Sequence, residues 1–512
     1  MTNQDPFTPG EWKEYPGYNT PLPEDVHVPG KVKTSLGKLK FDDGRPRDKT
    51  ARKLYNYLDT SRAVEAYLNH IGAVSTEMQR LIHDEKAGPG CNYIIIGEQL
   101  TDANTIWLTG NTGTVYAFFV LDLKRDGPTV VEMPGKAGPG FLDDAWMRWV
   151  TDFGPTGPDR GEGGTYVILP PDYEGEIEAP SQGGVKTSMN IGGEEREVFV
   201  VKSRTYMNWS ALRGFLVDGK PDFSVNLFKE NLKIYPLKDA ANPPQMQFHN
   251  MSGELSSTIF PRTARYFKLL NDVVQREPLA ALDAESRGLL AAIGIEKGAP
   301  FPQDERWIEI YEDAAAIADG IGRAILYAPR DDDAFIYPDR QWYWGFVGGS
   351  HEWLRDEGRG GIHLDARITF FYGAIAVTPA MVLKMIGKGS QYAFCSRDKN
   401  GRYLDGGKTY RLTIPAGVPA KDFWSIVLYD PQTRAMLQTG QKYPALNSVR
   451  SGLKVNEDGS VDLYFGPEAP EGWENNWAQT TPGKGWFVLF RIYGPLEAWF
   501  DKSWKLNDFE LI

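Results

Sequence analysis

The chain has 512 residues, of which 41% are hydrophobic and 24% charged, so it is long enough for roughly two to four folded domains. Its formal net charge is −12 and it has no basic block, so nucleic acid is not an expected partner. An acidic surface repels anionic lipid, and no stretch reaches the roughly 18 apolar residues that span a bilayer, so no membrane contact is expected. The N-terminal sequence lacks a basic region followed by an apolar one. This predicts a cytoplasmic protein as written, or a periplasmic or secreted one if a leader has been removed.

Aromatic residues make up 12% of the chain, and glycine and proline are abundant, with 54 and 35 residues. Large flat side chains pack well on pleated surfaces, and sandwiches need a turn every few residues. The composition therefore favours β-sheets. The two cysteines, Cys91 and Cys395, match no metal or redox spacing, so we expect two buried free thiols, with a single disulfide as the alternative.

The first part of the chain divides into an arm and a helical segment. Residues 1–50 are rich in Pro, Gly and charge without periodicity, which indicates an extended arm of the kind that can lie over a neighbouring subunit. Residues 51–88 repeat apolar side chains at threes and fours, which predicts an amphipathic helix that bends or splits near Gly72.

Residues 89–205 predict an antiparallel β-sandwich. Short β-branched or aromatic runs recur there, with turn sequences such as GNTG and KRDGP between them. The expected strands are Tyr93–Ile96, Ile106–Thr109, Val115–Leu123, Thr129–Met133, Thr165–Leu169 and Val198–Val201.

The remaining chain divides into a helical region and a second β-domain. Residues 206–391 form the helical region and linker, with expected helices at Trp209–Phe215, Arg262–Gln275, Ala280–Ile293 and Asp304–Tyr327. Residues 392–512 return to strands, at Tyr392–Ser396, Thr409–Ile414, Phe423–Tyr429, Gly452–Val455, Val461–Phe465 and Trp486–Tyr493. The expected fold is therefore mainly β with a helical insert, an α+β multidomain protein.

Several long motifs carry a resemblance to a known kind of protein. They are TGNTGTVYAFFVLDLKRDGPTVVEMP, DFGPTGPDRGEGGTYVILPPDYEG and VVKSRTY in the first half, then PAKDFWSIVLYDPQT, LKVNEDGSVDLYFGPEAPEGWENNW and GWFVLFRIYGPLEAWF in the second. The chain resembles bacterial proteins that pair domain of unknown function 1254 with domain of unknown function 1214. This resemblance implies an N-terminal immunoglobulin-like sandwich, central helices, a C-terminal jelly roll and a homo-oligomer. It implies no activity.

Four charged residues stand out because they lie in apolar runs expected to be strands, where burial is costly without a partner: Asp122, Arg204, Arg367 and Arg491. One interpretation places the arginines in an inter-domain cleft, where they hold a carboxylate or a polarised carbonyl. The alternative is a set of structural salt bridges between domains.

Aromatic residues gather between 340 and 372 and in the last strands, including Trp344, Phe371, Tyr372, Trp424 and Tyr429. They would suit a pocket for an apolar or aromatic small molecule, or alternatively a packed core. His363 and Asp365 would share a face if they lay on a strand, but no metal motif supports them, so we expect neither metal nor cofactor. No GxSxG elbow or GxGxxG fingerprint is present.

These patterns give three hypotheses of different classes. The first is a small-molecule enzyme, provisionally a hydrolase, with its site at the domain junction. Its expected catalytic residues are Arg367, Tyr372 and His363, and its expected substrate-binding residues are Asp122, Arg204, Trp344, Phe371, Trp424, Tyr429 and Arg491. The second is a structural or assembly protein that forms jelly-roll oligomers without catalysis. The third is a carrier or sensor that uses the same pocket without chemistry.

Overall fold

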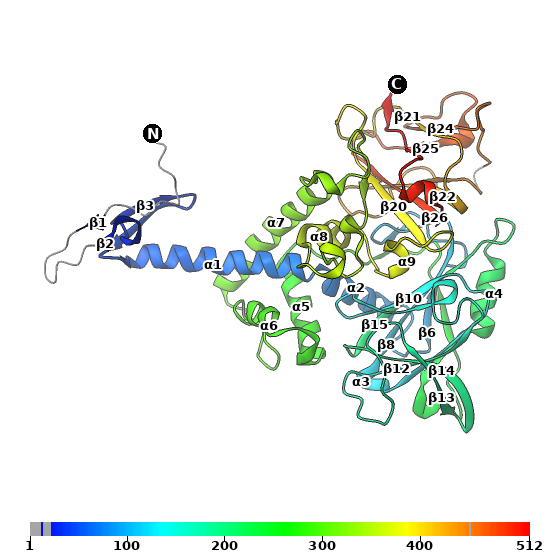
Figure 1. The fold of residues 1–512 in the computed structure, drawn as a ribbon, viewed down its shortest axis with the longest axis horizontal. Coiled ribbons are helices and arrows are strands. Elements are labelled where there is room, and N and C mark those ends of the chain that lie inside the picture. The colour runs from blue at the N-terminus through cyan, green and yellow to red at the C-terminus, as the bar shows by residue number, and fades with distance from the viewer. Residues whose placement is uncertain (1–11, 14–21, 450–451) are drawn as a thin grey trace.

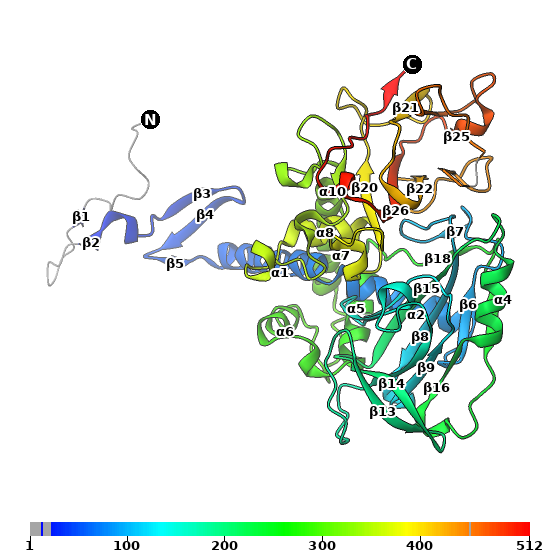
Figure 2. The same ribbon diagram turned by 45° about the vertical axis from the view of Figure 1, so that its right-hand side comes forward.

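The computed structural model describes residues 12–13, 22–449 and 452–512, and Figures 1 and 2 show two β-rich domains joined by helices. Part of the expected arm, residues 1–11 and 14–21, lies outside the described residues. The rest of the arm is not simply extended. Strands β3 (Lys31–Thr34), β4 (Gly37–Asp42) and β5 (Arg45–Pro46) form a small antiparallel ribbon, and β1 (Trp12–Lys13) pairs with β2 (Leu22–Pro23).

The ribbon stands away from the body at the end of helix α1 (Asp48–Asn69). Apart from Thr50, the buried residues of α1 lie in its C-terminal part, where the ring of Tyr67 stacks on that of Tyr266 at 3.8 Å. The expected split of the helix occurs at His70, and Gly72 lies within α2 (Ile71–Lys86). A Cβ on Gly72 would lie 2.8 Å from the carbonyl oxygen of Trp146, so this glycine permits close packing of α2 rather than the bend. The expected homo-oligomer stays a prediction.

The first β-domain contains two sheets. The six-stranded sheet has the order β11 (Trp149–Phe153), β10 (Gly140–Asp144), β15 (Met207–Gly214), β8 (Val115–Asp122), β6 (Tyr93–Ile96) and β17 (Gln247–Asn250). The five-stranded sheet has the order β13 (Val185–Ile191), β14 (Glu194–Lys202), β12 (Gly164–Leu169), β9 (Thr129–Met133) and β16 (Lys233–Pro236). Short helices α3 (Leu123–Asp126) and α4 (Asp222–Asn231) connect them. A shared core of residues such as Phe119, Tyr166 and Val201 joins the two sheets.

The structure corrects two local expectations in this domain. Residues 209–214, expected as part of a helix, belong to β15, which is buried on both faces. Trp209 and Ala211 face the helices while Leu212 faces the other sheet, so the apolar run lacks the alternation that marks a half-exposed strand. The expected strand Ile106–Thr109 shortens to β7 (Thr105–Ile106), which pairs with β18 (Ser256–Ser257), and the chain then continues as a loop.

The helical region packs between the domains. It contains α5 (Arg265–Arg276), α6 (Ala284–Ala291), α7 (Glu305–Tyr327), α8 (Leu364–Gly373) and α9 (Pro379–Val382). The first three confirm the helices expected from periodicity at 262–275, 280–293 and 304–327. Arg367 was expected in a strand but lies within α8, and His363, for which a strand was only one possibility, is the N-cap of that helix. The run RITFFYG is buried on nearly all sides, so it shows no strand or helix period.

The C-terminal domain also contains two sheets. The five-stranded sheet has the order β19 (Tyr343–Trp344), β20 (Ser390–Cys395), β26 (Phe487–Pro495), β22 (Ala420–Tyr429) and β23 (Ala445–Asn447). The four-stranded sheet has the order β25 (Trp477–Gln479), β24 (Val461–Gly466), β21 (Tyr410–Ile414) and β27 (Glu510–Leu511), and α10 (Glu497–Phe500) follows β26. Residues 452–455, expected as a strand, form a loop. A core that includes Leu412, Leu463 and Phe490 joins the sheets.

The mainly β multidomain class is confirmed, with helices inserted between two β-domains. The immunoglobulin-like and jelly-roll topologies stay predictions. Cys91 and Cys395 are both buried and free, as expected. Within the described part of the chain, no helix is both long enough and apolar enough to cross a bilayer.

Candidate ligand site

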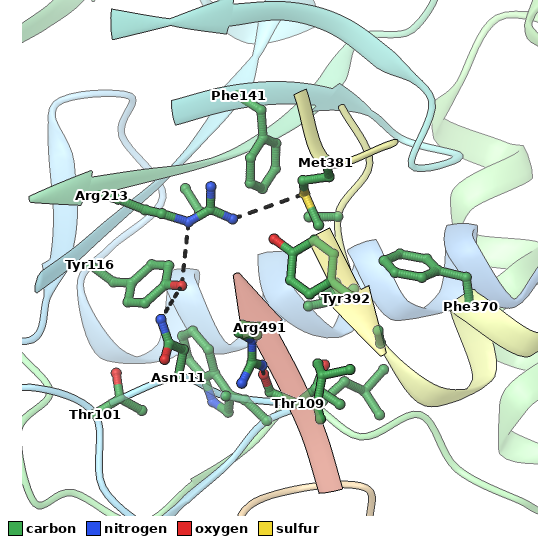
Figure 3. Close-up of a pocket in the computed structure, with 18 of the residues that line it drawn as sticks. Thr101, Thr109, Asn111, Tyr116, Phe141, Arg213, Phe370, Met381, Tyr392 and Arg491 are labelled. Atoms are coloured by element: carbon green, nitrogen blue, oxygen red, sulfur yellow. Dashed lines mark hydrogen bonds between the residues drawn. The ribbon is translucent and has the colours of Figure 1, made fainter. Parts of the chain in front are cut away.

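A cavity lies where the first β-domain, the C-terminal domain and helix α8 meet, and Figure 3 shows its lining. It contains about 790 Å³ of space between atoms, its open mouth included. The six-stranded sheet contributes side chains from β8 and β15, and the five-stranded C-terminal sheet contributes side chains from β20 and β26. The loop after β7 and the segment 374–381 line the remaining walls. The cavity is therefore a product of the domain junction.

One wall of the cavity is aromatic. The Phe118 ring lies 4.8 Å from that of Trp107 and 6.1 Å from that of Trp209, and Phe141 lies 5.3 Å from Trp209, between ring centroids. Phe370 at the end of α8 adds another apolar surface. An interlocked set of rings of this kind keeps its shape and offers a flat apolar surface to a ligand.

Two arginines face the same cavity. Arg491 on β26 is 4% exposed, and its Nη2 donates a hydrogen bond to the carbonyl oxygen of Thr109 at 2.8 Å. Arg213 on β15 donates from Nε to the Tyr116 hydroxyl at 3.4 Å, and its Nη2 lies 4.0 Å from Met381 Sδ. Among the described residues, no carboxylate oxygen lies within 4.0 Å of either guanidinium group, and the lining contains neither Asp nor Glu.

The lining also contains buried donors without an acceptor. Nη1 of Arg491 and Nε2 of Gln79, a residue of α2 that is 3% exposed, have no hydrogen-bond partner in the described structure. A buried charge without a partner costs several kcal/mol, roughly, and a buried donor without an acceptor costs about 1–3 kcal/mol. An acceptor that carries negative charge would remove both costs.

Three tyrosines lie around the arginines. Asn111 donates from Nδ2 to the Tyr493 hydroxyl at 2.9 Å and to the Tyr116 hydroxyl at 3.4 Å. Burial alone would raise the pKa of the Tyr116 hydroxyl, but the charge of Arg213 and the hydrogen bonds from Asn111 and Arg213 outweigh it, so this pKa lies below its ordinary value. Burial instead raises the pKa of Tyr493. Of Tyr116 and Tyr493, Tyr116 is thus the one better placed to give up a proton.

Two buried aspartates hold the segment that closes the cavity on one side. The Asp143 carboxylate accepts a hydrogen bond from the backbone N–H of Val377 at 2.9 Å, and Asp152 accepts from the Thr378 hydroxyl at 2.8 Å. Burial raises the pKa of Asp143 well above its ordinary range. Burial also raises the pKa of Asp152, from 3.8 to about 6, although its hydrogen bonds from Thr378 and Trp149 act in the opposite direction.

The raised pKa of Asp152 predicts a pH effect on stability. Because the folded pKa lies above the unfolded one, the protonated form stabilises the fold below about pH 4, and this contribution is lost as pH rises to about 6. The rise in the pKa of Asp152 corresponds to a change of about 3 kcal/mol in the free energy of unfolding. Asp152→Asn removes the charge, and its Oδ1 can still accept from Trp149 Nε1 while its Nδ2 can donate to the Thr378 hydroxyl in place of the bond that Asp152 accepts. It should therefore unfold at a higher temperature than the parent at pH 8, with the difference vanishing near pH 4. Thermal unfolding at several pH values measures this. An equal loss of stability at every pH would contradict it.

The structure brings two of the expected site residues to the cavity or its edge. Arg491 lines it, and Tyr429 lies beside it, with the Arg491 guanidinium 5.7 Å from its ring and its hydroxyl donating to the carbonyl oxygen of Gly110 at 2.7 Å. The other eight lie outside the lining.

Two of those eight hold local structure together. Asp122 caps α3 by accepting hydrogen bonds from the backbone N–H groups of Lys124 and Arg125. Arg204 lies past the end of β14, with Nε 3.4 Å from the carboxylate of Asp144 on β10, so this ion pair lies within the first β-domain and not between domains. Burial lowers the pKa of Arg204 despite that partner.

The three expected catalytic residues do not form one site. Tyr372 is fully buried and donates to the Asp319 carboxylate at 2.6 Å, with the Arg434 guanidinium 4.4 Å from its ring. Arg367 donates to Asn69 Oδ1 at 2.6 Å, and burial lowers its pKa. His363 accepts at Nδ1 from the backbone N–H of Ala366, as the cap of α8. They point to different neighbours because they share a short helix rather than one face of a strand.

The remaining expected residues pack in cores. Phe371 contacts the ring of Trp353 at 5.4 Å, Trp424 lies 6.0 Å from Phe490, and Trp344 meets Trp499 edge-on at 5.8 Å.

One group of possible metal ligands lies elsewhere. Asp331, Asp333 and His363 place ligand atoms within 4.8 Å of one another. The Arg355 guanidinium lies 3.3 Å from Nδ1 of His363, so a positive charge already adjoins the group. Asp365, which shares the sequence neighbourhood of His363, pairs instead with Arg330 at 2.7 Å. The arrangement favours capping of α8 and ion pairing over metal binding.

Sequence reasoning missed most of the polar lining, namely Gln79, Asn111, Tyr116, Arg213, Tyr392 and Tyr493. Arg213 carries the same signal as the four charged residues that were singled out, because it follows the apolar run WSAL in a strand. The expectation of a helix at 209–215 hid that signal.

The fold and the cavity define a two-domain β protein with a ligand-sized space at its domain junction. Residues 91–236 match the family model "Protein of unknown function (DUF1254)", and residues 389–497 match "Protein of unknown function (DUF1214)". Both matches are therefore present in one chain, with the DUF1254 region before the DUF1214 region.

The chain also resembles solved structures, which bear on the fold alone. It is similar to the VPA0106 protein from Vibrio parahaemolyticus, with 15% identity and a TM-score of 0.51 over 89% of this chain and 100% of that one. A putative uncharacterized protein from Burkholderia cenocepacia has 11% identity and a TM-score of 0.39 over 90% and 96% of the two chains. No curated protein matches the chain.

Proposed function

We propose that this protein binds a small carboxylate-bearing molecule with an apolar or aromatic body in the cavity at its domain junction. The observation that carries the proposal is the pair of cavity arginines, Arg213 and Arg491, with no carboxylate oxygen of the described residues within 4.0 Å of either. Buried arginines elsewhere bond to protein groups, as Arg276 does to Glu77 at 2.7 Å and Arg434 does to the carbonyl oxygens of Tyr372 and Gln432. An arginine that faces a cavity without a carboxylate can hold the carboxylate of a ligand.

The apolar part of the ligand follows from the rings opposite. Trp107, Phe118 and Trp209 offer flat surfaces on which an aromatic or branched body would lie, and burying it would contribute about 25 cal/mol per Å². A molecule of a single ring or a short chain suits a cavity with about 790 Å³ of space between atoms, its open mouth included.

The groups in the lining limit the chemistry. The lining contains no Ser, Cys or His, so a hydrolase with a nucleophilic serine or cysteine is not what it favours. Proton transfer is within reach of Tyr116, whose hydroxyl has a lowered pKa and accepts hydrogen bonds from Arg213 and Asn111. Binding is thus the primary proposal, with Tyr116 as the acid–base candidate should a reaction follow.

The test compares a carboxylate with its neutral analogue. Benzoate should bind the wild-type protein and quench the fluorescence of Trp107 and Trp209, while benzamide should bind more weakly. Arg213→Met and Arg491→Met should each weaken benzoate binding roughly 30-fold or more in calorimetry, because each removes one partner of a buried charge pair. Arg367→Met is the matched control, since this buried arginine lies outside the cavity, and it should leave binding unchanged.

The proposal fails on either of two results. One is that benzoate, phenylacetate and hexanoate all leave the wild-type protein unbound. The other is that the double variant, with both cavity arginines replaced, binds them as well as the parent.

A further inference from the structure

A second hollow adjoins the cavity, shares part of its wall and is rimmed by exposed side chains, and we call it the outer hollow. Arg213, Met381 and Tyr493 line both spaces. The outer hollow is otherwise formed by the loop at 155–160, the loop at 387–389 and the start of β22. The two spaces are therefore neighbours, separated only by side chains that both contact.

The outer hollow is rich in positive charge, although the whole chain carries a net charge of −12. Arg160, Lys388 and Lys421 line it, and all three are exposed. Among the described residues, none of these three has a carboxylate within 4.0 Å, and Asp422 is the single acidic residue of the lining. Unpaired cations around a concave surface raise the local concentration of anions.

The wall between the two spaces has a rigid backbone and a flexible side chain. Met381 lies on α9, whose cap Thr378 accepts a hydrogen bond from the Ala380 N–H and donates one to Asp152. Gly389 has a φ of 68°, and a Cβ there would lie 2.1 Å from the Ala380 carbonyl oxygen, so β20 begins in direct contact with α9. The backbone cannot yield, while the unbranched Met381 side chain can adopt other rotamers.

We infer that the outer hollow is the entrance through which the anionic ligand reaches the cavity, with Met381 as the side chain that separates the two. This inference rests on the proposed function. Arg160, Lys388 and Lys421 attract the carboxylate, and Arg213, which lines both spaces, receives it at the wall. The Met381 side chain, whose sulfur lies 4.0 Å from Nη2 of Arg213, then moves to another rotamer.

The test measures the rate of benzoate binding by stopped-flow tryptophan fluorescence. Reversing both lysines, K388E with K421E, should slow association roughly tenfold at low ionic strength, and the difference should shrink as salt screens the charges. K49E with K238E is the matched control, because it makes the same change of net charge at exposed lysines that line neither hollow. This control should associate at the wild-type rate. Met381→Ala should raise both the association and the dissociation rate constants.

The possible outcomes separate the two proposals. Binding of benzoate with equal association rates in both double variants would overturn the entrance while leaving the proposed function standing. Unchanged rate constants in M381A would overturn the role of Met381 as the separating side chain. Absence of any benzoate binding to the wild-type protein would count against the proposed function itself.

Discussion

Arg491→Met is expected to make the ligand-free protein more stable, by about 1–3 kcal/mol, while it weakens ligand binding. Arg491 is 4% exposed, its Nη1 has no partner, and no carboxylate compensates its charge in the described structure. Methionine fills a similar volume without the cost of burying a charge. The lost hydrogen bond to the Thr109 carbonyl reduces this gain by about 1 kcal/mol. Thermal unfolding without ligand measures the effect.

The matched control is the same substitution at a paired arginine. Arg276 lies 2.7 Å from Glu77 and 3.1 Å from Glu277, and the side chains of these glutamates are 2% and 0% exposed. Arg276→Met leaves both carboxylates buried with less compensation, so it should cost about 3 kcal/mol. If Arg491→Met raises the free energy of unfolding while Arg276→Met lowers it, Arg491 is a residue kept for binding. A comparable loss of stability in both would show that Arg491 is structural.

Gly322→Ala is expected to destabilise the protein by about 1–3 kcal/mol. A Cβ at this position of α7 would lie 2.4 Å from the nearest carbon of the Tyr372 ring. The Tyr372 ring cannot move aside easily, because its hydroxyl donates a hydrogen bond to Asp319 and the ring packs edge-on against the Phe260 ring. The centroids of these two rings are 5.9 Å apart. Compared with the parent, the variant should show a lower unfolding temperature and an altered near-ultraviolet circular dichroism signal from tyrosine.

Gly320→Ala gives the control within the same helix. Gly320 is exposed, and a Cβ there would meet no atom within 4 Å. Alanine has a higher helix propensity than glycine, so this variant should gain about 0.5–1 kcal/mol. Equal stability of the two variants would contradict the close contact between α7 and Tyr372. The pair also tests whether Tyr372 holds helix α8 in place, as its bond to Asp319 indicates, rather than acting on a ligand.

The spacing of apolar residues in the sequence was sufficient to predict the elements that have one solvent-exposed face. Helices at 262–275 and 304–327 were expected and are present as α5 and α7, because their apolar side chains recur at helical spacing. It failed for β15 and α8, whose residues are buried on nearly all sides. An element covered on both faces loses its polar positions, and with them the period that distinguishes strand from helix.

The candidate site shows the same division. Composition identified arginines and aromatic residues at a domain junction as the features of interest, and Arg491 lies there with Tyr429 beside it. Other polar residues of the same lining, Gln79, Tyr116 and Arg213, come from α2, β8 and β15, far from β26 in the sequence. Spacing along the chain carries no information about side chains that meet only when two domains dock.

The sequence by itself determined the β-rich class, the order of the domains, the two free thiols and most of the strands, because these follow from local patterns of burial and turns. Only the tertiary structure decided which charged residues are neutralised. Arg204 lies close to Asp144, whereas neither Arg213 nor Arg491 has a carboxylate oxygen within 4.0 Å among the residues that the structure describes. The physical reason is that the cost of burying a charge depends on what stands within a few ångströms of it, and packing alone sets those distances.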